Sequence, residues 1–336
     1  MTASRARLRC ETRAAIPGGT AGVASDTPRG SGDASNRTED EPYVRNHRSP
    51  TRPGGETTSE RARAAPWHAS LALGFARRDG GTVLGRRAHC GPLRIQKPLF
   101  PEGAAVCHAV VLHPSGGIAG GDVLDLAVDA AQGAHALLTT PGAGKWYRAG
   151  ERRASQHVTV SVSDGAIVEW LPQPTIFFDG VDADLATCVT LAAGALYIGW
   201  EALCFGRTAS GERFSRGRVA LRTTIERNGR PLWHERAIID GGSPWLSARA
   251  GLAGRPVCAT LVAAGRAVAR EVVDACRAAP VPMGVDTGVT ALPDVLLARC
   301  VAPDTERATM WFAALWAALR PALAGRAAIP LRVWNT

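Results

Sequence analysis

The sequence predicts a mainly β protein built from layered, antiparallel-rich sheets, with about two helices near the C-terminus. From Trp67 to about residue 265, short segments alternate polar and apolar residues, and Gly, Pro and Asp turns separate them. Two stretches after residue 265 instead repeat their apolar residues at helical spacing. Repeated strand–turn–strand segments with little helix are typical of layered β architectures.

The first 65 residues differ in composition from the rest. They are rich in Gly, Pro, Ser, Thr, Arg and acidic residues, and Tyr43 is their only aromatic residue. Such a segment buries too little apolar surface to offset the entropy that it would lose on ordering. We therefore predict that residues 1–65 are a disordered N-terminal extension, and that residues 66–336 form one β-rich domain.

Individual strands and turns can be located within this domain. Ser155–Val162 alternates polar and apolar residues, and the Asp164-Gly165 pair that follows is typical of tight turns. Ile167–Leu171 is then expected to return as the second strand of a hairpin. Arg218–Arg227 predicts a further strand, and Asn228-Gly229 predicts the next tight turn.

Two helices are expected near the C-terminus. Ala267–Ala278 places its apolar residues on one helical stripe. Asp304 is a favourable cap for a second helix, which we expect Pro321 to end. Large apolar residues on one face of this helix are expected to belong to the core and not to a cofactor site. They are Trp311, Phe312, Leu315, Trp316 and Leu319.

Composition and charge exclude several classes of protein. The net charge of +9 is spread thinly, without the block of consecutive basic residues that is typical of a nucleic-acid-binding arm. The sequence contains no run of about 18 apolar residues, so a membrane span is not expected. The first arginines are not followed by an apolar stretch, so a secretory signal is not expected either. The eight cysteines are scattered and form no C-x-x-C pair. We expect a cytoplasmic protein with reduced thiols and no structural zinc, which binds neither nucleic acid nor membrane.

The Gly-rich segments do not fit a nucleotide site. Gly144-Lys145 is followed by Trp146, and Thr139 stands where the first glycine of a phosphate-binding loop belongs. The Gly116–Gly121 loop leads into a strand and not into a helix N-terminus. No G-x-S-x-G motif marks a nucleophilic serine. We expect no enzyme activity, and a β-rich hydrolase is the alternative.

A preformed Cys/His metal site is disfavoured. Cys107, His108 and His113 lie close together in sequence, in a strand that leads to a turn. On a strand, His108 and His113 point to opposite faces because their positions differ by an odd number. Cys107 is then expected to be a core thiol, and a transient role towards nickel is the alternative.

Carboxylates among apolar or Gly-rich neighbours indicate a different chemistry. They are Asp122, Asp179, Glu201, Glu212 and Glu235. Glu201 follows an apolar segment, so it is expected to be partly buried, and a buried carboxylate needs a partner or water. A salt bridge to Arg148 or Arg207 would satisfy Glu201, and this interpretation is favoured by the residues alone. A hydrated internal passage for divalent cations is the other interpretation.

Five segments between residues 91 and 217, taken together, resemble the UreD (also called UreH) family of urease accessory proteins. The most specific are Leu138–Arg148 and Trp170–Gln173, and Leu331–Thr336 resembles the family's ending. Pro174 stands where the family commonly has Glu, and Gly144 where it has Thr or Ser. Pro174 therefore removes one carboxylate that could contact a cation.

The resemblance implies a helicoidal, layered β fold with two helices and a scaffold that is not an enzyme. It implies assembly with UreF, UreG and apo-urease, and passage of nickel(II) from UreG through an internal tunnel to urease. Nickel would be bound transiently and no cofactor tightly. Oxygen ligands suit such a path because they hold a divalent ion weakly enough for it to move. The candidates for lining or guarding the path are Asp122, Asp179, Glu201 and Glu235.

The partner-binding surface is less well defined by the sequence. Trp146, Tyr147 and the aromatic C-terminal helix are candidate anchors, since aromatic residues dominate interface energetics. Core packing is the alternative for each of them. An interaction module or nickel store unrelated to urease is the alternative for the whole chain.

Overall fold

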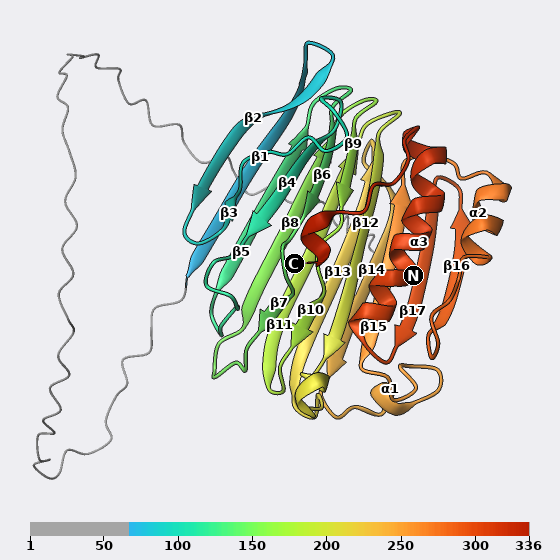
Figure 1. Ribbon diagram of the computed structural model, residues 1–336. Coiled ribbons are helices and arrows are strands. Elements are labelled where there is room, and N and C mark those ends of the chain that lie inside the picture. Colours follow the sequence, from blue (N-terminus) through green and yellow to red (C-terminus); the bar gives the residue numbers. More distant parts are fainter. Residues whose placement is uncertain (1–66, 336) are drawn as a thin grey trace, which may run out of the picture. The chain divides into compact units, whose positions relative to one another are not determined.

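A computed structural model describes residues 67–335, so the predicted extension over residues 1–65 lies outside the described residues. The described chain forms two stacked β-sheets with two helices on one of them (Figure 1). The prediction of a mainly β, layered fold is confirmed. No helix among residues 67–335 is long and apolar enough to cross a membrane.

The first sheet, called sheet I, has seven strands. In spatial order they are β14 (Arg230–Asp240), β13 (Gly217–Arg227), β11 (Val181–Leu191), β8 (Ala154–Val162), β5 (Val123–Ala130), β1 (His68–Arg78) and β2 (Gly81–Cys90).

The second sheet, called sheet II, lies against it across an apolar core. In order its main strands are β16 (Asp286–Leu292), β17 (Val295–Ala302), β15 (Val257–Ala264), β12 (Leu196–Phe205), β9 (Ile167–Trp170), β6 (His135–Thr139), β4 (Cys107–Leu112) and β3 (Arg94–Ile95). β10 (Thr175–Phe177) pairs with β12 and with β7 (Gly144–Trp146).

The middle of the chain winds between the two sheets. It passes from β5 to β6, from β8 to β9 and from β11 to β12, and each pass adds one strand to each sheet. Within each sheet the successive strands are parallel. This winding produces the helicoidal layering that the family resemblance implied.

The same turn recurs at each of these three crossings. Gly133, Gly165 and Gly194 have φ of 67°, 63° and 67°, and each is followed by an alanine. A left-handed conformation is accessible to glycine without a Cβ clash, so the chain can leave one sheet and enter the other. The strands that precede the crossings end in register, with Ala130 opposite Val162 and Val162 opposite Leu191.

Two local expectations about pairing are wrong. Asp164-Gly165 does not close a hairpin, because β8 belongs to sheet I and β9 to sheet II. Antiparallel pairs are fewer than expected and lie mostly towards the ends of the sheets, for example β1–β2, β13–β14 and β15–β17. A turn signal marks where a strand ends but does not determine which sheet receives the next one. The Asn228-Gly229 hairpin is confirmed, with both residues at positive φ.

The two expected C-terminal helices are present. α2 spans Arg270–Arg277, and α3 spans Thr305–Ala324. Asp304 caps α3 by accepting a hydrogen bond from the backbone of Arg307. The expectation that Pro321 ends the helix is wrong, because Pro321 lies inside the last turn and the helix continues to Ala324. Gly325 ends the helix with a φ of 67°.

The remaining short helices are α1 (Pro244–Ser247), η1 (Thr208–Ser210) and η2 (Arg332–Asn335). α2 and α3 cover the outer face of sheet II and form a second apolar core with it. The large apolar residues of α3 are buried there, as expected for core residues; they are Trp311, Phe312, Leu315, Trp316 and Leu319.

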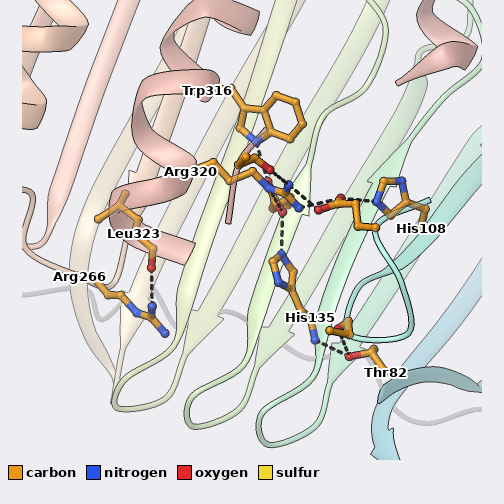
Figure 2. A network of polar contacts seen from close by, with 11 residues as sticks. Thr82, His108, His135, Arg266, Trp316, Arg320 and Leu323 are labelled. Carbon is orange, nitrogen blue, oxygen red and sulfur yellow. Dashed lines mark hydrogen bonds and ion pairs between the residues drawn. The ribbon is translucent and has the colours of Figure 1, made fainter. Parts of the chain in front are cut away.

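A buried polar network ties α3 to sheet II (Figure 2). Glu169 of β9 has no exposed surface and accepts hydrogen bonds from Trp316 and Arg320 of α3 at 2.6 and 3.0 Å. The Nε2 atom of His135 lies 2.7 Å from the same carboxylate. Burial raises the pKa of Glu169, but the hydrogen bond and charge of His135 and the charge of Arg320 outweigh it and lower that pKa.

The network extends to Glu102, which precedes β4. Arg320 donates to both of its oxygens, at 2.7 and 2.9 Å, and the Nε2 atom of His108 lies 2.6 Å away. Burial alone would raise the pKa of Glu102, but these bonds lower it to about 2. Arg320 therefore pairs with two carboxylates within an apolar layer, which fixes α3 in position.

We predict that Arg320→Met lowers the free energy of unfolding by about 3–5 kcal/mol, because two buried carboxylates lose their common cation. Urea denaturation of the variant and the parent measures the difference. Arg153→Met is the control, since Arg153 pairs with Asp182 at 2.8 Å on the surface. That variant is expected to lose less than about 1 kcal/mol. Equal losses in the two variants would contradict a stabilising role for the network.

Candidate functional site

A cavity of about 400 Å³ lies between the two sheets. Its lining includes residues of β5, β8, β11, β13 and β14 in sheet I. On the other side it is lined by residues of β4, β9, β12 and β15 in sheet II. The five lining strands of sheet I follow one another across that sheet, and those of sheet II extend from β15 to β4. The cavity therefore runs across the strands and not along them.

One row of side chains forms the sheet I wall of this cavity. Leu126, Val158, Thr187, Thr223 and Glu235 are direct neighbours on adjacent strands, from β5 to β14. Directly paired residues point to the same face of a sheet, and all five line the cavity. The row therefore changes from apolar to hydroxyl to carboxylate towards the edge of sheet I.

A matching row lies on sheet II. Glu201 of β12 pairs with Thr260 of β15, and Thr260 pairs with Arg299 of β17. Glu201 and Thr260 line the cavity. The register thus places Glu201 and Arg299 on the same face, opposite Glu235 of sheet I. The two sheets bring both carboxylates to the same end of the cavity, which we call the acidic end.

Glu201 is partly accessible, and the surface that it lines is that of the cavity. Within residues 67–335 no hydrogen bond or ion pair engages its carboxylate. Burial raises the pKa of Glu201 to about 7, the negative charge of Glu235 adds to this, and the positive charge of Arg299 opposes it. Above about pH 7 the acidic end therefore holds an ionised carboxylate with unused lone pairs.

The carboxylate of Glu235, unlike that of Glu201, forms an ion pair. Its Oε1 atom lies 2.6 Å from Nη2 of Arg299, and the guanidinium of Arg299 lies 5.7 Å from the ring centroid of Trp233. Trp233 and Glu235 are on sheet I and Arg299 is on sheet II, so this contact bridges the sheets.

The opposite end of the cavity is lined by basic side chains and glycines instead of carboxylates. His113, Gly116 and Gly117 line it just after β4, together with Lys145 of β7. Burial lowers the pKa of His113, although the charge of Asp122 opposes this shift. A neutral imidazole retains a nitrogen lone pair that can bind a metal ion.

Of the four candidate acids from the sequence, the structure brings Glu201 and Glu235 together and places Asp122 and Asp179 elsewhere. Asp122 accepts hydrogen bonds from the backbone of Trp67 and Ala119, at 3.0 and 2.8 Å, and so fixes a loop. It does not line the cavity.

Asp179 also has a local structural role. It accepts hydrogen bonds from the backbone of Ser215 and Arg216 at 2.8 Å, and it forms an ion pair with the Arg216 side chain at 2.9 Å. Burial acts to raise the pKa of Asp179, but these donors hold it well below its usual range. A role of Asp122 or Asp179 in contacting nickel stays a prediction from the sequence.

The expected salt bridge from Glu201 to Arg148 or Arg207 is wrong. Arg207 pairs with Glu212 at 3.0 Å, and Arg148 donates to the backbone oxygen of Asp179. Arg207 lies close to Glu201 in sequence, whereas Arg299, the cation whose charge lowers the pKa of Glu201, comes from β17. Sequence proximity could not identify Arg299, because that requires the register of β12, β15 and β17.

The Cys/His cluster around β4 is dispersed, as expected. Cys107 is a buried free thiol, and burial raises its pKa to about 11. His108 belongs to the buried network, while only His113 lines the cavity. Within residues 67–335 no three His, Cys, Asp or Glu side chains are arranged to hold a metal ion.

The two aromatic interface candidates differ in exposure. Trp146 is 1% exposed and packs on Phe177, so it belongs to the core. Tyr147 is 38% exposed and meets Phe178 edge-on, with ring centroids 5.1 Å apart. Tyr147 therefore remains a candidate anchor for a partner.

A sequence model described as UreD urease accessory protein matches residues 68–335, which is nearly all of the described chain. The chain belongs to the UreD urease accessory protein family. A urease accessory protein UreD from Dechloromonas aromatica is 52% identical over 273 residues, which are 80% of this chain and 95% of that protein. One from Azoarcus sp. is 51% identical over 270 residues, 80% of this chain and 94% of its own length.

The environment of Glu201 in this UreD-family chain predicts a pH-dependent effect on stability. The folded-state pKa is raised from 4.5 to about 7, so the parent loses stability as the pH rises through this window. Glu201→Gln removes the charge and should stabilise the fold at pH 8 by on the order of 3 kcal/mol. Most of this gain should be absent near pH 5, where the parent carboxyl is largely protonated in the folded state.

Thermal or urea unfolding at the two pH values measures this effect. Glu226→Gln is the control, because Glu226 lies outside the cavity and its carboxylate accepts a hydrogen bond from Thr190 at 3.4 Å. The same gain for Glu201→Gln at pH 8 and pH 5 would contradict the raised pKa.

Proposed function

We propose that this chain is a cytoplasmic scaffold and conduit for nickel(II) during the activation of apo-urease, in a complex with UreF, UreG and the urease subunits. It binds the ion transiently, holds no tight cofactor and catalyses no reaction. Membership of the UreD family supports the link to urease.

The conduit proposal rests on the cavity, which lies between the two sheets, runs across their strands and ends between Glu201 and Glu235. A divalent cation enters a low-dielectric interior only where charges or dipoles replace its water. The acidic end supplies two carboxylates, and the wall continues with the hydroxyls of Thr223 and Thr187. The ion can therefore exchange water for protein oxygen in steps.

The same ligands also favour release. Carboxylate and hydroxyl oxygens bind nickel less tightly than a set of thiolates and imidazoles does. A nickel ion that must pass on to urease dissociates more readily from such a row of oxygen ligands than from a complete chelate. Lys145 at the opposite end gives the two ends of the path different charge.

We predict that Glu201→Ala and Glu235→Gln each lower the nickel bound to urease, by roughly tenfold or more. One charge–charge contact at intermediate dielectric contributes a few kcal/mol, and about 1.4 kcal/mol corresponds to a factor of ten. Urease subunits, accessory proteins and nickel are combined with each variant, and both enzyme-bound nickel and urease activity are measured.

Assembly must be measured in the same samples, because a scaffold defect would also lower activation. Glu226→Gln, outside the cavity, is the matched control and should activate urease like the parent. Normal nickel loading with Glu201→Ala in an intact complex would reject the conduit. Normal activation in the complete absence of the chain would reject the accessory role itself.

A further inference from the structure

One cationic side chain pairs with a carboxylate of the acidic end. Arg299 of sheet II reaches Glu235 of sheet I, and its guanidinium lies over Trp233 at 5.7 Å from the ring centroid. Thr260, which lines the cavity, separates Arg299 from Glu201 in the strand register. The ion pair thus occupies the space between the edge strand β14 and the strand β17.

We propose that Arg299 is a displaceable gate for the cavity: it closes the acidic end by pairing with Glu235, and a divalent cation replaces it between Glu235 and Glu201. This inference rests on the proposed conduit and deepens it, because it identifies the residue that controls entry. Arg299 acts as a competitor for Glu235 and not as a ligand of the metal ion.

The charges explain why the exchange favours a divalent ion. With Glu201 and Glu235 ionised, the closed end carries two negative charges and the single positive charge of Arg299. Replacing the guanidinium by a monovalent ion leaves the net charge unchanged. Replacing it by a divalent ion neutralises both carboxylates, which is favourable where the surroundings are partly desolvated.

The exposure of the three side chains permits the exchange. The Arg299 side chain is 47% exposed, so its guanidinium can move into water without a large desolvation penalty. The Glu235 side chain is 27% exposed and stays at the wall. Among residues 67–335 no donor bonds to the Glu201 carboxylate, so it is available to the arriving cation. An ion pair as exposed as Arg299–Glu235 is weak, so a metal ion can displace it.

A second bridge between the sheets offers a matched control. Arg227 at the end of β13 pairs with Asp294, between β16 and β17, also at 2.6 Å and with exposures of 29% and 30%. Neither residue lines the cavity. If arginine ion pairs merely hold the sheets together, replacing Arg227 and replacing Arg299 should change the nickel affinity equally.

Equilibrium dialysis of the full chain against nickel(II) alone tests the gate. Arg299→Gln should bind nickel roughly fivefold more tightly than the parent, because Glu235 loses its competitor. Arg227→Gln should bind like the parent. The double variant Arg299→Gln with Glu235→Gln should lose the gain. Trp233→Leu is a second variant, and it should also tighten binding because it weakens the docking of Arg299.

Unchanged nickel affinity in both Arg299→Gln and Trp233→Leu, or an equal gain in Arg227→Gln, would overturn the gate. The amount of nickel loaded into urease distinguishes a failure of the gate from a failure of the conduit. Tighter binding by Arg299→Gln, together with normal loading by Glu201→Ala, would support the gate and reject the conduit. Defective loading by Glu201→Ala, with Arg299→Gln binding like the parent, would support the conduit and overturn the gate.

Discussion

Strand register is the constraint on which the cavity and its charged end depend. A shift of one residue in β14 or β12 would turn Glu235 or Glu201 to the outer face of its sheet. The recurring glycine turns at Gly133, Gly165 and Gly194 keep the three crossings aligned, so that rows of side chains run across the sheets. The buried Arg320–Glu169 contact then fixes α3 against the outer face of sheet II.

The sequence allowed the fold class, the Asn228-Gly229 hairpin and both C-terminal helices to be predicted, since each depends on local pattern. It did not predict that Asp164-Gly165 leads to the other sheet, because pairing partners are set by contacts distant in sequence. Glu201 was identified by its apolar neighbours, but Arg299, whose charge acts on it, was not. Asp122 and Asp179 carry the same local signal and instead cap loops.

The acidic end illustrates a conflict between stability and function. Burial and the charge of Glu235 raise the pKa of Glu201, so keeping this carboxylate ionised destabilises the fold at neutral pH. A glutamine would be more favourable there for stability alone. Retaining a carboxylate without a hydrogen-bond donor makes sense if a cation occupies the position during part of the protein's working cycle.

Locating nickel directly tests the central claim that the cavity carries the ion. Anomalous diffraction at the nickel absorption edge, from crystals of the chain with its partners exposed to nickel(II), would show where the ion binds. The account predicts an anomalous peak in the cavity, between Glu201 and Glu235. Nickel peaks only outside the cavity, with none between Glu201 and Glu235, would contradict it.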